Sequence, residues 1–168
     1  MQKKGRLVWI TGLAGSGKTT LAKRLQEEMD YKPVHLDGDN IREILDETTT
    51  HGIDGRQRTA KIYSKLCSYL TNQGHDVIMS TISLFHDIHD YNKEHNKNYY
   101  EVLLQVDPDI LRQRDKKDLY TTADGNVMGL HQTPEFPKNP TLVLTNNNEE
   151  EIDQNVQAII KVLNNGKA

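Results

Sequence analysis

Short runs of branched apolar residues recur along the chain, separated by longer segments whose apolar positions have helical spacing. The apolar runs lie at 7–10, 34–36, 77–79, 102–106 and 142–144. The helix-like segments lie at about 17–29, 40–47, 56–73, 86–95, 108–114 and 149–164. Runs without polar alternation are typical of strands buried on both faces, and strands that alternate with helices form parallel sheets. The pattern therefore predicts an α/β fold, a three-layer α/β/α domain with a central parallel five-stranded sheet.

The pair Asp107-Pro108 marks one helix start, because Asp is favoured at the N-cap and Pro at the first helical position. No repeat and no Pro-, Gly- or Ser-rich linker divides the chain. A length of 168 residues is ordinary for one domain. We therefore expect a single domain over residues 1–168.

The composition of the chain limits the binding partners and the cellular compartment that we expect for the protein. The formal net charge is −3, which does not favour nucleic acid or a membrane surface as a partner. The chain holds one cysteine, Cys67, so a disulfide framework within it is excluded and a reducing compartment is favoured. The apolar run after the basic N-terminus is too short for a signal peptide or a membrane span, and we expect a cytoplasmic protein.

The segment from Gly12 to Thr19, GLAGSGKT, matches the phosphate-binding pattern G-x-x-x-x-G-K-[ST] at every position. It follows the first apolar run and opens the first helix, so backbone N–H groups and the helix N-terminus would face a phosphate. Lys18 would reach the β- and γ-phosphates, and Thr19 would ligate Mg²⁺. A glycine-rich turn without a ligand is the alternative, which the full match disfavours. The residues predicted to bind ATP here are Gly12, Ala14, Gly15, Ser16, Gly17, Lys18, Thr19 and Thr20.

This motif is shared by kinases, GTPases and ATPases. GTPases usually carry N-K-x-D, but here Asn96-Lys97 is followed by Asn98 and Tyr99, so the base-reading Asp is missing. The chain is also short for an ATPase with added machinery. A small-molecule kinase is the function that remains.

Two carboxylates, Asp37 and Asp39, follow the second apolar run. Ligands of parallel sheets bind beyond the carboxyl ends of the strands, so both side chains would face the crevice of the phosphate loop. One would position Mg²⁺ and the other would accept the proton of the attacking hydroxyl, and the residues do not say which is which. Arg42 would hold an anionic group of the acceptor. The alternative is a turn in which Asp-Gly-Asp only caps the next helix.

Three segments together give the chain a family resemblance. They are GLAGSGKTT at 12–20, LDGDNIRE at 36–43 and QRDKKDLY at 113–120, the last followed by GLHQTPEFPKNP at 129–140. With these motifs in this order, the chain resembles the adenylylsulfate (APS) kinase family of P-loop kinases, which phosphorylate the 3′-hydroxyl of a nucleotide.

The resemblance implies further site residues. Arg114 would bind ATP from a lid segment at about 112–137. The residues that would contact the acceptor are Asp39, Arg42, Arg56, Thr59, Ile82, Ser83 and His86. Lys18, Asp37 and Asp39 would be the catalytic residues, and Thr19 and Asp37 would hold the metal. The resemblance also implies ATP and Mg²⁺ as cofactors, a small-molecule nucleotide as acceptor, and assembly as a homodimer.

The chain departs from the family pattern on the acceptor side. An arginine of the family is replaced by His86, an asparagine by Thr59, and the phenylalanine that clamps the adenine of APS by Val127. Loss of an aromatic clamp removes stacking worth ~1–3 kcal/mol per base. These changes favour the branch of the family that phosphorylates cytidine diphosphoramidate, in bacterial capsule modification, because its base is smaller.

Three alternatives stay open. The first is an authentic APS kinase of sulfate assimilation. The second is a small-metabolite kinase of the gluconate or shikimate type, which shares the phosphate loop and the size. The third is a non-catalytic module that senses nucleotides.

Overall fold

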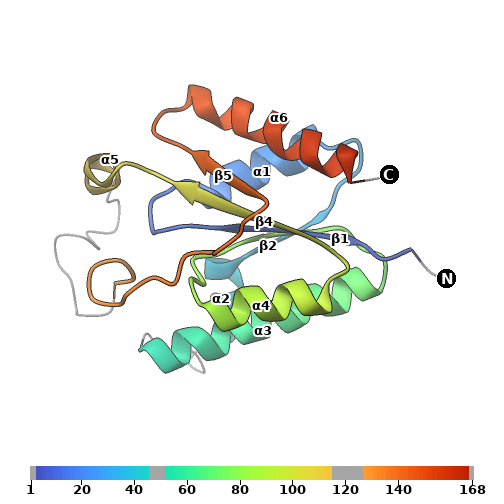
Figure 1. The fold of residues 1–168 in the computed structure, drawn as a ribbon, viewed down its shortest axis with the longest axis horizontal. Helices are drawn as coiled ribbons and strands as arrows, with labels where there is room; N and C mark the ends of the chain where they lie inside the picture. Colours follow the sequence, from blue (N-terminus) through green and yellow to red (C-terminus); the bar gives the residue numbers. More distant parts are fainter. Residues whose placement is uncertain (1–2, 46–51, 115–126, 167–168) are drawn as a thin grey trace.

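The computed structural model describes residues 3–45, 52–114 and 127–166, which contain six helices and five strands (Figure 1). The strands are β1 (Arg6–Thr11), β2 (Val34–Asp37), β3 (Val77–Ser80), β4 (Asn98–Gln105) and β5 (Leu142–Thr145). The helices are α1 (Lys18–Glu28), α2 (Gly38–Leu45), α3 (Ile53–Asn72), α4 (His86–His95), α5 (Pro108–Gln113) and α6 (Glu150–Asn165).

The five strands form one sheet in the order β2-β3-β1-β4-β5, and all four pairs of neighbours are parallel. This confirms the predicted three-layer α/β/α fold. Helices α1 and α6 cover one face of the sheet, while α3 and α4 cover the other (Figure 1). None of the helices in the described ranges is both long and apolar enough to cross a membrane.

Alternate strand residues supply the two cores, as strands buried on both faces require. On the α3 and α4 face, Trp9 and Met79 of the sheet are fully buried with Tyr63 and Ile88 of the helices. On the α1 and α6 face, residues such as Ile10, Leu25, Ile78, Leu104 and Ile159 form the second core.

Most element boundaries agree with the sequence pattern, with two differences. Strand β4 begins at Asn98 rather than at the predicted residue 102. Its first residues, Asn98 to Glu101, are polar or amphipathic and form no apolar run. They belong to the strand because they pair with Arg6 to Trp9 of β1. Helix α3 begins three residues earlier than predicted, at Ile53. The predicted helix start at Asp107 is confirmed, since its side chain accepts a hydrogen bond from Asp109 N–H at 2.9 Å.

Because every strand is parallel, all five carboxyl ends lie along one edge of the sheet. The phosphate loop follows β1, the Asp-Gly-Asp turn follows β2, and the Ile82–Ser83 segment follows β3. The ends of β4 and β5 add Gln105 to Asp107 and Asn146 to the same edge. The fold thus gathers segments that are far apart in the sequence into one crevice.

Candidate active site

The phosphate loop takes the conformation that its glycines permit. Gly17 has a φ of 88° and directly precedes α1, a backbone conformation that side chains with a Cβ rarely adopt. A Cβ at Gly17 would also lie 2.3 Å from Asn146 Nδ2. The loop therefore requires glycine here both for its backbone angles and for its close approach to Asn146.

Lys18 is buried at the base of this loop. Its Nζ donates a hydrogen bond to the Leu13 carbonyl at 2.7 Å and lies 3.4 Å from Ser16 Oγ. Burial lowers the pKa of Lys18 from 10.5 to about 8, against the opposing effect of the Asp39 and Asp37 charges. The ammonium thus sits in a pocket where water solvates it poorly and where a triphosphate would supply its missing counter-charge.

Asp37 is the most heavily hydrogen-bonded side chain of the site. Its Oδ2 accepts from Thr19 Oγ1 at 2.6 Å and from Ser80 Oγ at 2.7 Å. Its Oδ1 accepts from the backbone N–H groups of Asp39 at 3.1 Å and Asn40 at 3.4 Å, which caps α2. Asp37 therefore caps a helix, as the alternative interpretation of the turn proposed, and also links β2 to the phosphate loop.

These donors determine the charge of Asp37. Burial raises the pKa of a carboxyl, but here the hydrogen bonds from Thr19 and Ser80, helped by those from the backbone, hold the pKa of Asp37 below its ordinary value. Asp37 is therefore a carboxylate at neutral pH.

The Thr19 and Asp37 oxygens suit Mg²⁺. This ion prefers oxygen ligands and is commonly held by one or two carboxylates together with substrate phosphates, rather than by an all-protein cage. Within the described ranges no three His, Cys, Asp or Glu side chains gather in a way that could hold a metal. One hydroxyl and one ionised carboxylate beside a phosphate loop therefore fit a magnesium ion that arrives with a nucleotide.

A group of charged side chains faces this loop from α2 and α3. Burial lowers the pKa of the half-buried Arg56, the nearby Arg42 lowers it further, and Asp39 raises it, so the three charges lie close together. Asp39 also acts on the pKa of Lys18. The structure thus brings Lys18, Asp39, Arg42 and Arg56 into one electrostatic cluster, and their roles toward a donor or an acceptor stay predictions. Two guanidinium groups here would attract an anionic acceptor.

The segment after β3 is held in a strained conformation. Ser83 has a φ of 23°, and it is the only non-glycine residue among those described with a positive φ. Its carbonyl accepts from Phe85 N–H at 3.1 Å and contacts His89 Nε2 at 3.2 Å, while Thr11 Oγ1 donates to the Ile82 carbonyl. Strain of this kind costs about 1–3 kcal/mol and clusters at functional sites. The surrounding contacts therefore preserve a defined shape at the predicted acceptor residues Ile82 and Ser83.

Two other predicted acceptor residues have protein partners. His86 Nε2 lies 3.0 Å from the Phe136 carbonyl, and its backbone N–H donates to Glu135 Oε2 at 2.7 Å. Thr59 is buried, and its hydroxyl donates to the Gly55 carbonyl of its own helix at 2.8 Å. Their roles toward an acceptor stay predictions.

Asn146, which the sequence analysis missed, joins the far end of the sheet to the phosphate loop. Its side-chain Nδ2 donates a hydrogen bond to the Ser16 carbonyl at 2.8 Å, and its backbone carbonyl accepts one from Arg114 Nη1 at 2.7 Å. The predicted ATP-binding residue Arg114 is therefore tied to the loop through Asn146. Its position in the sequence could have identified Asn146 as a site residue, because it directly follows β5 at the edge of the sheet where ligands bind. The rest of the predicted lid, at 115–126, lies outside the described residues.

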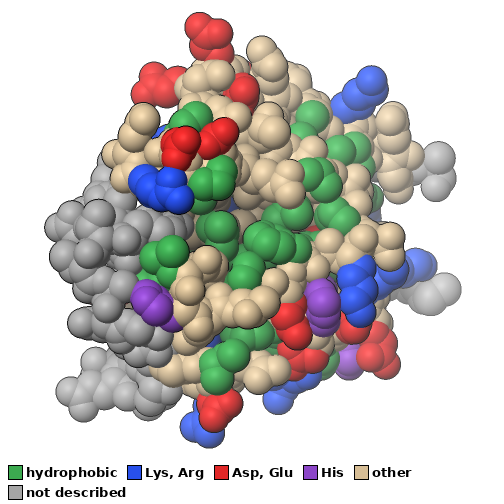
Figure 2. Space-filling model, turned by 60° about the vertical axis from the view of Figure 1, so that its left-hand side comes forward, with side chains coloured by type: hydrophobic (Ala, Val, Ile, Leu, Met, Phe, Trp, Pro, Cys, Tyr) green, Lys and Arg blue, Asp and Glu red, His purple; other side chains and the backbone are tan. Residues whose placement is uncertain are grey.

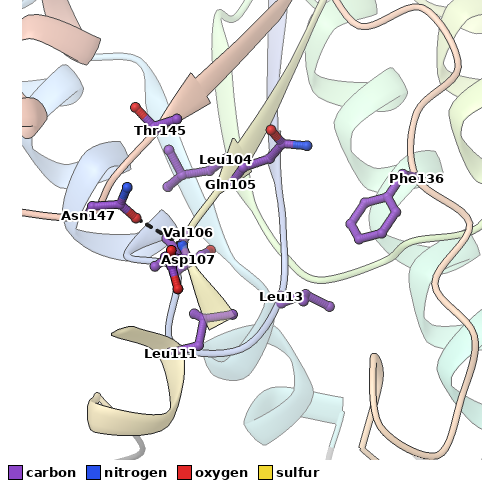
Figure 3. Close-up of a pocket in the computed structure, with 10 residues that line it drawn as sticks. Leu13, Leu104, Gln105, Val106, Asp107, Leu111, Phe136, Thr145 and Asn147 are labelled. Atoms are coloured by element: carbon purple, nitrogen blue, oxygen red, sulfur yellow. Dashed lines mark hydrogen bonds between the residues drawn. The ribbon is translucent and has the colours of Figure 1, made fainter. Parts of the chain in front are cut away.

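A cavity of about 340 Å³ borders the loop (Figure 3). Its walls come from the phosphate loop, the ends of β4 and β5, α5 and the segment before β5. They are Leu13, Ser16, Leu104, Gln105, Val106, Asp107, Leu111, Phe136, Thr145 and Asn147. Figure 2 shows hydrophobic side chains gathered across the middle of the face in view, with charged side chains around them. A largely apolar cavity with a few polar groups, next to a phosphate site, is suited to a nucleotide base.

Comparisons with known proteins agree with this geometry. The family described as adenylylsulphate kinase matches residues 4–145. Cytidine diphosphoramidate kinase from Campylobacter jejuni is 39% identical over 170 residues, covering 97% of this chain and 99% of the relative. Adenylyl-sulfate kinase from Bacillus velezensis is 34% identical over 150 residues, covering 84% and 76%. The structure of the Mycobacterium tuberculosis APS kinase in complex with AMPPNP and APS superposes with a TM-score of 0.85 at 28% identity, covering 96% of this chain and 98% of that one.

Proposed function

Because this chain belongs to the adenylylsulphate kinase family, we propose that it transfers the γ-phosphoryl group of ATP to the 3′-hydroxyl of cytidine diphosphoramidate. The observation that carries the proposal is the grouping of Lys18, Asp39, Arg42 and Arg56 into one charged cluster at the carboxyl edge of the sheet. Such a cluster would place a donor phosphate and an anionic acceptor on either side of one carboxylate.

The donor half of the site would act by charge and position. The N–H groups around Gly15 and Gly17 and the N-terminus of α1 would bind the phosphates, and Lys18 would neutralise the charge that develops on the transferred group. Thr19 and Asp37 would hold Mg²⁺, which would help to neutralise the negative charge of the phosphates. The base of ATP would lie in the cavity beside Leu111 and Asn147.

The two carboxylates would have different roles. Asp37 accepts four hydrogen bonds, which keep its carboxylate ionised beside Thr19. An ionised carboxylate in this position suits a ligand of the metal. Asp39 is exposed at the start of α2 and lies within the charged cluster. Asp39 would therefore orient the acceptor hydroxyl and take its proton.

The acceptor half supports a pyrimidine over a purine. Val127 stands where the family has an aromatic clamp, and it is only 9% exposed, so it offers neither an aromatic face nor much contact area. The full-length match to the Campylobacter kinase points to the same acceptor. Authentic APS kinase is the second candidate, because APS kinases match most of the chain at 28–34% identity.

An acceptor panel tests the proposal. Purified protein with Mg²⁺ and ATP is given cytidine diphosphoramidate, APS, gluconate or shikimate in turn, and ADP release and the phosphorus NMR spectrum of the product are recorded. We expect a 3′-phosphorylated cytidine product and a kcat/KM for APS lower by about tenfold or more, from the lost stacking.

Asp39→Asn separates catalysis from binding in the same assay. We expect kcat to fall by about 10²–10⁴-fold, the usual contribution of general acid–base catalysis, while the affinity for Mg·ADP is retained. Efficient turnover of APS would replace our acceptor with the second candidate. ADP release with a sugar acid alone would establish the small-metabolite alternative, and nucleotide binding without transfer to any acceptor would establish a sensing module.

A further inference from the structure

Three polar side chains line up on one face of the sheet behind the metal side of the site. Val34 and Leu36 of β2 pack into the α3 and α4 core, so the alternate residues His35 and Asp37 face α1. Ser80 is the register partner of Asp37 on β3 and lies on the same face as Ile78, a member of the α1 and α6 core. The strand register therefore aligns His35 and Asp37 with Ser80 from the neighbouring strand.

Hydrogen bonds connect the three side chains in a row. His35 Nε2 lies 2.9 Å from Ser80 Oγ, and Ser80 Oγ lies 2.7 Å from Asp37 Oδ2. The same Oδ2 accepts from Thr19 Oγ1 at 2.6 Å. The row thus runs from β2 through β3 and ends at the first residues of α1.

Counting protons fixes the direction of every bond in the row. An ionised carboxylate can only accept, so the single proton of the Ser80 hydroxyl points to Asp37. The Ser80 oxygen then has only lone pairs to offer His35, so His35 must carry a proton on Nε2 and donate it. Asp37 thereby selects, through Ser80, which ring nitrogen of His35 is protonated.

We propose that His35 is a positioning residue for magnesium binding: it fixes the Ser80 hydroxyl as a donor to Asp37 and so orients the carboxylate that serves the metal. This inference rests on the proposed function, in which Asp37 and Thr19 hold Mg²⁺. Without His35, the Ser80 hydroxyl can rotate and Asp37 loses one fixed donor. Partners of this outer kind orient metal-site carboxylates, and their loss commonly costs 10–100-fold in metal affinity. Because His35 acts through one intervening hydroxyl, we expect a loss of about three- to tenfold.

The first test reads the His35 tautomer without metal or nucleotide. In a long-range ¹H–¹⁵N correlation spectrum of the full chain, we expect the pattern of an Nε2-protonated ring, assigned by its absence in His35→Asn. A ring protonated only on Nδ1 would overturn the proposal, because His35 could then only accept from Ser80.

The second test uses two amides of different reach. In His35→Gln the amide nitrogen stands as many bonds from Cα as Nε2 does, so it can still donate to Ser80. In His35→Asn the amide is one bond too short. Titration calorimetry of ADP with and without Mg²⁺ gives the contribution of the metal to nucleotide affinity. We expect that contribution to be retained in His35→Gln and to fall about three- to tenfold in His35→Asn, with ADP affinity in EDTA unchanged in both.

A double-mutant cycle with Ser80→Ala completes the design. Once Ser80 lacks its hydroxyl, His35→Asn should cause no further loss of magnesium affinity. Equal magnesium contributions in His35→Gln and His35→Asn, or a loss that persists in EDTA, would refute the role of His35 while leaving the kinase assignment intact. Failure of the unmodified protein to bind Mg·ADP would refute the proposed function itself.

Discussion

At the scale of single residues, Lys18 is a charge that the fold buries at a cost to stability. It is the only lysine among the described residues that is buried, and it makes a hydrogen bond to Leu13 rather than an ion pair with a carboxylate. A buried lysine of this kind favours binding of a polyanion, because the charge of a bound triphosphate would replace the solvation that burial removed.

The pH dependence of the enzyme should reveal this lysine. Because burial lowers the pKa of Lys18 to about 8, the free protein loses this charge above about pH 8. We expect kcat/KM for Mg·ATP to fall about tenfold per pH unit above that value, since kcat/KM reports groups of the free enzyme. kcat should decline only at higher pH, because bound phosphate raises the pKa of the lysine. A profile of kcat/KM that stays flat to pH 10 would contradict this.

Removing the charge should stabilise the protein. The folded-state pKa of about 8 lies below the ordinary value of 10.5, so between these values the unfolded chain binds more protons and stability rises with pH. Below about pH 8 the buried charge costs the full amount, on the order of 3 kcal/mol. Lys18→Met should therefore unfold at a higher temperature than the unmodified chain at pH 7, and the gap should narrow at pH 10. Calorimetric melting at both pH values measures it.

At the scale of elements, residues 127–140 are fastened to α4 by Glu135. Its carboxylate accepts the His86 N–H at the first residue of α4, and its own N–H donates to the Leu84 carbonyl at 3.1 Å. Leu84 directly follows the strained Ile82–Ser83 segment. One residue thus caps α4 and joins the segment that carries Val127 to the segment after β3.

Removing the Glu135 carboxylate should weaken binding of the acceptor and leave binding of ATP unchanged. Glu135→Ala removes a helix-capping carboxylate worth about 1 kcal/mol, and we expect a several-fold higher KM for the acceptor with little change in the KM for ATP. Glu135→Gln is the matched control, because its amide oxygen can still accept from His86 N–H. Steady-state kinetics with each substrate varied in turn provide the measurement, and an unchanged acceptor KM in Glu135→Ala would show that the tie is only structural.

A second tie between elements runs from the end of β5 to the phosphate loop. Asn146→Asp would set a negative charge against the Ser16 carbonyl and beside the place proposed for the phosphates. We expect ADP affinity to fall about tenfold or more, by charge repulsion at short range. Asn148→Asp adds the same charge at an exposed position two residues away and should leave affinity unchanged. Calorimetric titration with ADP distinguishes the two variants.

At the scale of the whole molecule, stability and chemistry occupy different parts of the fold. The two cores lie on the faces of the sheet, while the site lies along its carboxyl edge. Changes deep in the α6 layer should therefore lower stability without altering the site.

Ile159→Ala tests this separation. Ile159 is 1% exposed and packs in the core between α6 and the sheet, so truncation should cost about 2–5 kcal/mol of unfolding free energy. The KM values for both substrates should not change at temperatures where the variant stays folded. Trp9, the single tryptophan and fully buried, reports unfolding by fluorescence in urea. Lys161→Ala, on the exposed side of α6, is the control.

Much of this architecture could be predicted from local sequence. The five strands and the phosphate loop are encoded by continuous segments, in which apolar runs and glycines have direct structural meaning. Strand β4 was predicted too short, because Asn98 to Glu101 pair with β1 through the backbone and leave no apolar signature. Thr19 was predicted to share the metal with Asp37, but the hydrogen bond from Ser80 to Asp37 could not be predicted, because Ser80 lies 43 residues away along the chain.

The sequence by itself determined the fold class, the loop that grips phosphates and the family of the chain, because these depend on periodicity and on contiguous motifs. Only the tertiary structure decided that Asp37 accepts hydrogen bonds from α1, β3 and α2, and that Asn146 reaches Ser16 across 130 residues. The physical reason is that a side chain acquires its charge state and its hydrogen-bond direction from neighbours in space. In a parallel sheet those neighbours come from strands that the sequence keeps far apart.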